Sequence, residues 1–265
     1  MTLRINSNGL FLLLIRDLKS SPLLTLRSFL TPLSFPLFYL YIGGIIYQTF
    51  FSTVMYRGVI VPYTLYLAIG LIIIQIYQGA NLTTSLFWSD IRINMLSQLK
   101  HMGFSSRTYF LSKMLMSAII SGCYGLFFYF LTLPICFYTG FFYSFRYDTI
   151  IIFIFILFFS SLFFISYYFL ISSIVKDIDS YTIIITTTLF PLMFLSNVFY
   201  PIDKIPSPWN NIFYWNPLSI FARILRDALL NFTVNEIDLI IGFLVMILFI
   251  TITFHFFEKK YHQSS

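Results

Sequence analysis

The side chains of this chain that could do chemistry are few, and their spacing fits no catalytic or metal-binding motif. Asp177 and Asp179 form a close carboxylate pair, but they lie in a short polar turn where a solvated loop explains them. His101, His255 and His262 lack the spacing of metal ligands. None of the eleven glycines precedes a lysine, so the phosphate-binding loop of nucleotide hydrolases is absent from the sequence. We therefore expect no catalytic residue, no bound metal and no bound cofactor.

Uncharged polar side chains inside apolar stretches form a second group of interest. Gln75, Gln78 and Asn81 recur every three residues, which places them along one slowly turning side of a helix. Such groups most often join helices through hydrogen bonds worth about 0.6 kcal/mol each. They also suit a path for a cargo, and the residues alone leave both interpretations open. The candidate pathway residues are Gln75, Gln78, Asn81, Thr84, Thr186, Thr187 and Thr188.

Charged residues are missing from the middle of every long apolar stretch. Carriers driven by protons or sodium normally place ionisable or chelating groups at mid-membrane. An ion-coupled secondary carrier is therefore a disfavoured alternative, although backbone carbonyls alone are able to bind sodium.

The elements that must position these residues are membrane helices. Hydrophobic residues make up 58% of the chain and charged residues 10%, a balance that leaves a water-soluble domain without a polar cover. Uncharged stretches that can cross about 30 Å of hydrocarbon are expected to be helices, because an open strand would leave its backbone unpaired in lipid. The six predicted spans are Phe29–Phe51, Tyr63–Trp88, Met114–Tyr138, Thr149–Val175, Tyr181–Tyr200 and Leu239–Phe257.

The stretch before the first span, residues 1–28, is cut by charges and is too short in its apolar part to cross a membrane. A helix that begins after a cap at Ser7 carries Arg16 and Lys19 on one side. Its other side carries Leu10, Phe11, Leu14, Ile15 and Leu18. This pattern predicts an amphipathic helix that lies on the membrane surface.

The distribution of Lys and Arg predicts the orientation of the spans. Eleven of the sixteen basic residues lie in the N-terminal stretch, in the connections after spans two and four, and at the C-terminal end. The positive-inside rule therefore places both termini in the cytoplasm and the segment after span five outside. The net charge of +6 then reflects a cytoplasmic (inner) or plasma membrane rather than nucleic-acid binding.

The longest inner connection, residues 89–113, is net positive and fits two helices around a turn. Gly103 is suited to end a short helix that begins near Asp90, and Ser105 or Ser106 to cap the next one. A basic anchor on the inner surface is the plain interpretation of this connection.

The segment after span five is the most distinctive part of the sequence. Its four prolines forbid one continuous helix, and its aromatic side chains favour a water–lipid boundary. We expect an outer helical hairpin over residues 201–231, made of two short helices that lie at the membrane edge or dip into it. In the second helix Asn216 is the expected cap and Pro217 the first residue. Arg223 and Asp227 are expected to pair along that helix.

The order of residues in this segment resembles that of a known family. The residues concerned are Ser196-Asn197, Tyr200-Pro201, Pro206-Ser207-Pro208-Trp209, Tyr214-Trp215-Asn216-Pro217-Leu218 and Arg226. The segment is similar to the last part of type-2 ATP-binding-cassette (ABC) exporter permeases, and the likeness extends over nearly the whole chain. It implies an all-α integral membrane protein in which residues 1–265 form one transmembrane domain with six spans.

The resemblance also implies roles for three groups of residues. The inner connection corresponds to the coupling helix that docks on the ATPase, although Ile93–Gln98 depart from the Glu-rich step common in the family. Spans two and five would line a seam between two protomers, and the outer hairpin would gate exit. The ATPase-coupling candidates are Arg92, Leu96, Leu99, Lys100, His101 and Arg107. The outer-gate candidates are Pro201, Trp209, Asn216, Pro217 and Arg226.

The function implied by the resemblance is that of a permease subunit of an ATP-driven exporter. ATP and Mg would bind a separate ATPase subunit, and the permease would pair with a second copy or a related chain in the bilayer. The many Phe and Tyr residues suit a lipophilic, drug-like or lipid-linked cargo, and they equally suit contact with lipid. A polysaccharide or glycolipid exporter is the nearest alternative, and a membrane scaffold without transport is a further one.

Overall fold

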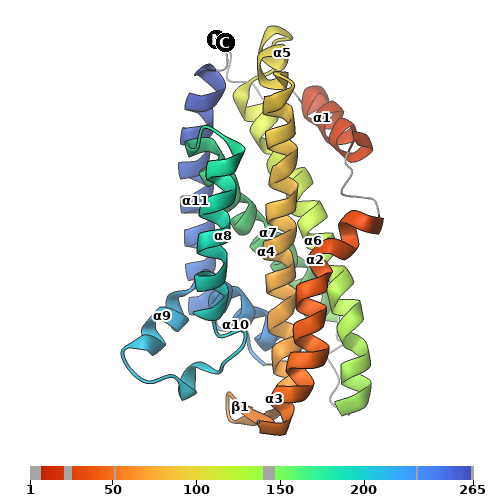
Figure 1. The fold of residues 1–265 in the computed structure, drawn as a ribbon, viewed down its shortest axis with the longest axis vertical. Coiled ribbons are helices and arrows are strands. Elements are labelled where there is room, and N and C mark those ends of the chain that lie inside the picture. The colour runs from red at the N-terminus through yellow and green to blue at the C-terminus, as the bar shows by residue number, and fades with distance from the viewer. Residues whose placement is uncertain (1–6, 21–25, 51, 140–146, 231, 264–265) are drawn as a thin grey trace.

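The computed structural model describes residues 7–20, 26–50, 52–139, 147–230 and 232–263. Within them the chain is a bundle of long helices that follow one axis, with one two-stranded hairpin (Figure 1). Five helices are long and apolar enough to cross a membrane, and one shorter apolar helix accompanies them. The predicted all-α membrane fold class is therefore confirmed.

The long helices fall close to the predicted spans and usually extend beyond them. The elements are α2 (Leu26–Phe38), η2 (Tyr39–Gly43), α3 (Gly44–Phe50), α4 (Tyr63–Arg92), α6 (Ser106–Thr139), α7 (Tyr147–Ile174), α8 (Ile178–Phe194) and α11 (Glu236–Gln263).

The first span is interrupted, because it carries two prolines. Pro32 and Pro36 lie inside α2, where each removes a backbone donor from the helical ladder. The helix then widens into the π-turn η2 before α3 continues the same path. Helices commonly bend at prolines and at π-bulges.

Helix α4 runs through the middle of the bundle (Figure 1). It contacts α2, α6, α7 and α10, so neighbours surround it on most sides. From Tyr63 to Tyr77 every side chain is buried. The core of the molecule is therefore built around this helix.

One end of the bundle, called the α5 end below, holds α1 (Ser7–Ser20), α5 (Met95–His101) and the last turns of α11 (Figure 1). Helix α1 packs on α6. The side chains of α1 that are buried are Leu13 and Asp17, whereas Phe11 and Leu18 are exposed. Its location on a membrane surface stays a prediction, and residues 1–6 and 21–25 of that segment lie outside the described residues.

The turn between α4 and α6 differs from its prediction at the beginning. The short helix does not start near Asp90, because α4 continues to Arg92 and α5 starts only after Asn94. Asn94 adopts a left-handed φ of 52°, which separates the two helices. Gly103 ends α5 with a φ of +81°, and the hydroxyl of Ser105 accepts a hydrogen bond from the backbone of Thr108, as the sequence suggested.

The opposite end, called the hairpin end below, holds β1 (Thr53–Tyr56) and β2 (Val59–Pro62). Their two-residue turn, Arg57-Gly58, has positive φ values of 47° and 78°, the combination of a type I′ turn. The all-helical prediction did not include this small sheet. Also at this end are η3 (Ile202–Lys204), α9 (Trp209–Trp215) and α10 (Pro217–Leu229).

Span five is shorter than predicted. Helix α8 ends at Phe194 rather than Tyr200, which leaves 17 residues. The side-chain amide of Asn216 donates to the carbonyls of Leu192 and Leu195 and so closes the helix end. The chain after α8 therefore turns back inside the bundle.

Helix α10 is buried from Leu218 to Leu229 and contacts α4, α7 and α11. The two-helix hairpin is confirmed as α9 and α10, and Asn216 caps α10 by accepting from the Leu218 amide. The predicted pair of Arg223 with Asp227 is wrong, because each residue meets a partner outside α10. A surface helix would favour the pair along its own axis, whereas a buried helix meets charges on neighbouring elements.

Candidate functional site

A cleft of about 330 Å³ opens between α2 and α8, and α4 forms its floor. The cleft lies within the apolar length of these helices. Its walls are Pro32, Phe35, Leu189, Phe190 and Met193, with Leu82 beside the polar floor. The floor carries two of the predicted pathway residues, Gln78 and Asn81. An apolar cleft with two amides at its base suits a largely apolar molecule that carries a polar group.

The other predicted residues of α4 do not line this cleft. Gln75 lies one turn nearer the hairpin end and is fully buried, and its amide has no hydrogen-bond partner in the described part of the chain. Thr84 is buried as well, and its hydroxyl donates to the carbonyl of Ala80. Thr84 therefore stabilises α4 locally and is not free to bind a cargo.

The three predicted threonines of α8 do not line the cleft. Thr186 and Thr187 are exposed, and the hydroxyl of Thr186 donates to the backbone of Thr182. Thr188 accepts a hydrogen bond of 3.0 Å from the phenol of Tyr167 in α7. The structure thus brings together Gln78 and Asn81 but not the predicted threonines.

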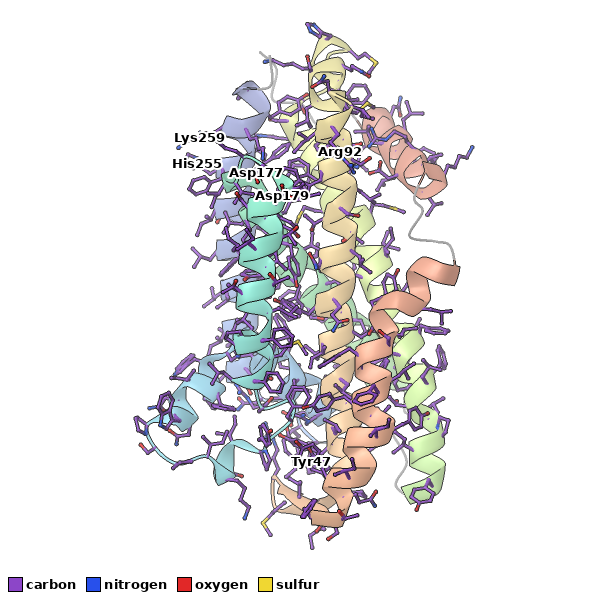
Figure 2. All side chains as sticks on the ribbon, in the orientation of Figure 1. Tyr47, Arg92, Asp177, Asp179, His255 and Lys259 are labelled. Carbon is purple, nitrogen blue, oxygen red and sulfur yellow. The ribbon has the colours of Figure 1, made fainter. Side chains whose placement is uncertain are left out.

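Helix α8 itself is loosely held. A second groove of about 510 Å³ follows its opposite side and is lined by α7, α9 and the start of α10. Two phenols tie α8 to its neighbours: Tyr167 donates to Thr188, and Tyr181 donates to Asn81 at 2.8 Å. The Asp177 carboxylate caps the first turn of α8 by accepting a hydrogen bond from the backbone amide of Ser180. This hydrogen bond lowers the pKa of the Asp177 carboxyl. Figure 2 shows Asp177 at the α5 end of α8.

The predicted coupling residues cluster mostly on α5. Leu96 and Leu99 are buried against the bundle, which fixes α5, whereas His101 is exposed. Lys100 donates to the carbonyl of His262 at the end of α11. Arg92 is exposed at the last turn of α4, close to α5 (Figure 2).

Arg107, the sixth coupling candidate, lies away from this surface. It belongs to the first turn of α6, and its guanidinium carbon is 5.9 Å from the centre of the Phe254 ring in α11. It therefore faces a groove between α6 and α11.

A cluster of buried charges at the α5 end was not foreseen from the sequence. Lys113 lies between two carboxylates, 2.9 Å from Asp17 in α1 and 2.7 Å from Asp90 in α4. Arg16 and the phenol of Tyr109 also donate to Asp90. The cluster balances two negative charges with two positive ones and joins α1, α4 and α6. Opposite charges at the ends of three separate helices are the signal that could have indicated it.

Arg226 anchors α10 at the hairpin end. Its side chain is fully buried and donates to the carbonyls of Tyr66 and Val198 at 3.1–3.2 Å. The guanidinium lies 3.6 Å from the centre of the Tyr66 ring. Gly70 leaves the room it needs, because a Cβ there would be 2.6 Å from the Arg226 Nη2.

Two ion pairs hold α10 to the elements around it. Asp227 accepts from Arg57 at 2.6 Å and from Tyr56 at 2.8 Å, and so binds the β-hairpin. Arg223 makes a two-pronged contact with Asp238 at the start of α11. Burial, and then the charge of Asp227, raise the pKa of Tyr56, so this phenol stays protonated as a donor.

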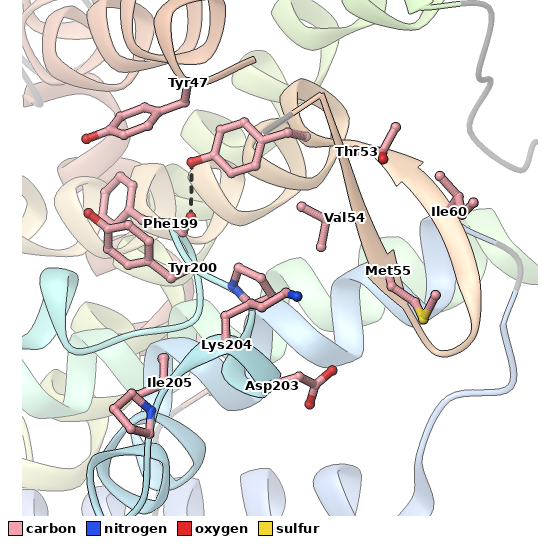
Figure 3. Close-up of a pocket in the computed structure, with 13 residues that line it drawn as sticks. Tyr47, Thr53, Val54, Met55, Ile60, Phe199, Tyr200, Asp203, Lys204 and Ile205 are labelled. Carbon is pink, nitrogen blue, oxygen red and sulfur yellow. Dashed lines mark hydrogen bonds between the residues drawn. The ribbon is translucent and has the colours of Figure 1, made fainter. Parts of the chain in front are cut away.

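A cavity of about 650 Å³ opens at the hairpin end between the β-hairpin, α3 and the turn after α8 (Figure 3). Tyr47, Tyr63, Phe199 and Tyr200 provide aromatic walls, and the phenol of Tyr63 donates to the Phe199 carbonyl. The remaining lining residues are Thr53, Val54, Met55, Ile60, Pro201, Asp203, Lys204, Ile205 and Pro206.

The predicted gate residues take different positions around this end. Pro201 lines the cavity, whereas Trp209 is 57% exposed on α9. Asn216 and Pro217 start α10, and Arg226 holds that helix in the bundle. Only Pro201 among them touches the cavity directly, and the others set the path of the chain beside it.

Within the described residues, no three His, Cys, Asp or Glu side chains come together as a metal site. The described residues form a cleft within the bundle, an exposed surface at the α5 end and a cavity at the hairpin end. The exposed surface consists of α5 and Arg92 and is called the α5 knob below.

Comparison with known proteins places the chain in a family. A search of curated proteins finds no match to it. The family model of the ABC-2 type transporter matches residues 12–230, which include α4, the α5 turn, the cleft and α10. Together with several apolar helices of membrane-crossing length, this match shows that the chain belongs to the ABC-2 type transporter family, as a multi-pass membrane permease.

Proposed function

We propose that this permease is the transmembrane domain of an ATP-driven exporter that moves a lipophilic or lipid-linked cargo. The observation that carries the proposal is the cleft between α2 and α8, whose walls are apolar and whose floor presents the amides of Gln78 and Asn81. Such a cleft suits a cargo with an apolar body and one polar group, entering sideways from the bilayer.

The driving force is proposed to come from a separate ATPase subunit that binds ATP and Mg. The α5 knob supports this proposal, because buried Leu96 and Leu99 fix it to the bundle while Arg92 and His101 remain exposed. The ion cluster of Asp17, Asp90 and Lys113 would transmit a displacement of the α5 end to α1, α4 and α6 together. In this proposal the α5 end and both termini face the cytoplasm.

A second protomer is proposed to complete the pathway. Helix α8 carries an exposed surface that includes Ile183, Thr186, Thr187 and Phe190. This surface borders the cleft, because Phe190 also lines the cleft. A homodimer or a heterodimer would cover this surface and close the seam. The outer cavity at the hairpin end would then receive the cargo on its way out.

A polysaccharide or glycolipid cargo is a second candidate. The outer cavity supports it, because three tyrosines and the Asp203 carboxylate combine aromatic faces with hydrogen-bonding groups. Stimulation of ATP hydrolysis by a glycolipid but not by a lipophilic dye would favour this alternative.

The cleft is tested with the permease reconstituted in vesicles together with its ATPase partner. Gln78→Leu removes a floor amide and is expected to raise the cargo concentration for half-maximal ATPase stimulation by about two- to tenfold, the worth of one hydrogen bond. The matched control is Asn8→Leu, which removes an exposed amide on α1 outside the cleft. Equal responses of the two variants would remove the cleft from the pathway.

The knob is tested by charge reversal. The double variant Arg92→Glu and Lys100→Glu should keep the permease folded but lower co-purification of the ATPase and uncouple hydrolysis from transport. Orientation is tested separately by Trp209→Cys in a chain that also carries Cys123→Ser and Cys136→Ser, and a membrane-impermeant thiol reagent should label it from outside intact cells. Unchanged coupling, or labelling only after the cells are broken, would contradict the proposed arrangement.

A further inference from the structure

A shallow groove of about 300 Å³ runs between α6 and α11 near the α5 end. Its lining residues are Arg107, Phe110, Leu111, Ile250, Thr251 and Phe254. The transport proposal does not use this groove. All of its residues except Arg107 and Thr251 are apolar, and Thr251 already donates its hydroxyl to the Leu248 carbonyl.

Arg107 is the cation at the mouth of the groove. Among the described residues no carboxylate lies within ion-pair distance of it, and its side chain donates no hydrogen bond. Its one described contact is the Phe254 ring, 5.9 Å from the guanidinium carbon. By contrast, Arg16, Arg57 and Arg223 each reach an aspartate. Arg107 therefore keeps five N–H donors for a ligand.

The position of Arg107 favours an anion. It lies in the first turn of a 34-residue helix, where the helix dipole adds positive potential. Glu258 lies nearby but is engaged by the hydroxyl of Ser106, 3.5 Å away. A fork-shaped guanidinium binds phosphate through paired hydrogen bonds better than a lysine does.

The rest of the groove fits a hydrocarbon chain. Phe110 and Phe254 pack edge to face at its base, and Leu111 and Ile250 form its sides. The groove follows two membrane-crossing helices from the level of Arg107 toward the bundle middle. A phosphate at Arg107 and an acyl chain below it correspond to one phospholipid.

We propose that the groove between α6 and α11 is a binding site for an anionic phospholipid, with its phosphate on Arg107 and an acyl chain along Phe110, Leu111 and Phe254. The site would hold α11 to α6 from the lipid side. It depends on the chain lying in a membrane and not on the nature of the exported cargo.

The test is native mass spectrometry of the purified full-length chain in mild detergent. Phosphatidylglycerol and phosphatidylcholine with the same acyl chains are added at equal concentrations, and the dissociation constant of the first bound lipid is measured. The wild type should prefer phosphatidylglycerol. Arg107→Gln should weaken phosphatidylglycerol binding about fivefold, the worth of one basic residue at an anionic surface, and leave phosphatidylcholine unchanged.

The matched control is Lys176→Gln, which removes one exposed cation from the same end of the bundle but outside the groove. It should change phosphatidylglycerol binding less than twofold. Equal losses in both variants would mean a general surface-charge effect and would overturn the site, as would wild-type binding by Arg107→Gln.

A second variant tests the groove with Arg107 in place. Thr251→Trp fills the groove from the exposed face of α11 and should abolish the preference for phosphatidylglycerol. If Arg107→Gln is not monodisperse, this variant decides alone: lost preference supports the site, and retained preference overturns it.

Discussion

Helices α4 and α8 have similar apolar compositions, but α4 is largely buried within the bundle and α8 is largely exposed. Twenty-two of the 30 residues of α4 are buried, against three of the 17 residues of α8. Several helices, among them α2, α6, α7 and α10, contact α4, whereas the principal helix contact of α8 is α7. A groove runs along each side of α8.

From this difference in burial we predict separate mechanical roles for the two helices. A tightly packed helix such as α4 has no room to move without breaking many contacts, because protein interiors are close-packed. Helix α8 is held by two phenol hydrogen bonds and by its terminal caps. We therefore predict that α4 stays fixed while α8 moves, whereas the family resemblance gave spans two and five the same place at a seam between two protomers.

The largest expected effect is at the α5 end of α4. Lys113→Met leaves the buried carboxylates of Asp17 and Asp90 without the cation between them. We expect a loss of about 3–5 kcal/mol in the free energy of unfolding, as when one partner is removed from a buried ion pair. Denaturant unfolding in detergent micelles measures it.

The control for Lys113→Met is a substitution just before the first turn of α8. Lys176→Met removes an exposed cation that makes no described ion pair, and it should change the free energy of unfolding by less than about 0.5 kcal/mol. Similar losses in both variants would remove the distinction between the two helix ends.

The next effect concerns the packing of α4 at the hairpin end. Gly70→Ala places a methyl group 2.6 Å from Arg226 and 2.9 Å from a Val198 methyl group. Overpacking of this kind costs about 1–3 kcal/mol. Gly242→Ala is the control, since its Cβ would meet only ordinary contacts of 3.6 Å or more. It should be neutral or stabilising, so a ranking in the opposite order would refute the tight fit around Arg226.

A smaller effect is expected in α8. Tyr167→Phe removes the hydroxyl that donates to Thr188. It should lower the free energy of unfolding by about 0.6 kcal/mol, the average for hydrogen bonds between membrane helices. Amide hydrogen exchange in α8 should quicken while exchange in α4 stays unchanged. Equal acceleration in both helices would argue against independent motion of α8.

The smallest effect is at the first turn of α8. Asp177→Ala removes the cap on Ser180 and should quicken exchange only in that turn, with Asp179→Ala as the control. Because the pKa of Asp177 is lowered in the folded chain, the cap contributes fully above about pH 4. Its contribution should be lost as the pH falls through that lowered value. A first turn that is equally ordered on both sides of this range would contradict the capping role.

Much of the fold was predictable from the order of residues. Runs without charges set the membrane helices, Gly103 and Asn216 marked helix ends, and Pro217 marked a helix start. These signals act between residues close in the chain, so the sequence carries them directly. The candidate site was predictable only in part, since Gln78 and Asn81 line the cleft and the predicted threonines do not.

Tertiary structure alone decided which apolar helix is buried and which charges meet. Hydropathy gave α4 and α8 the same description, because it sums over residues and ignores neighbours. Arg223 pairs with Asp238 rather than with Asp227, and Lys113 pairs with both Asp17 and Asp90. In each case the buried charge binds the partner that the packing of other helices places beside it. Membrane helices were therefore determined by the sequence itself, whereas the cleft, the anchored α10 and the loose α8 were determined by how those helices pack.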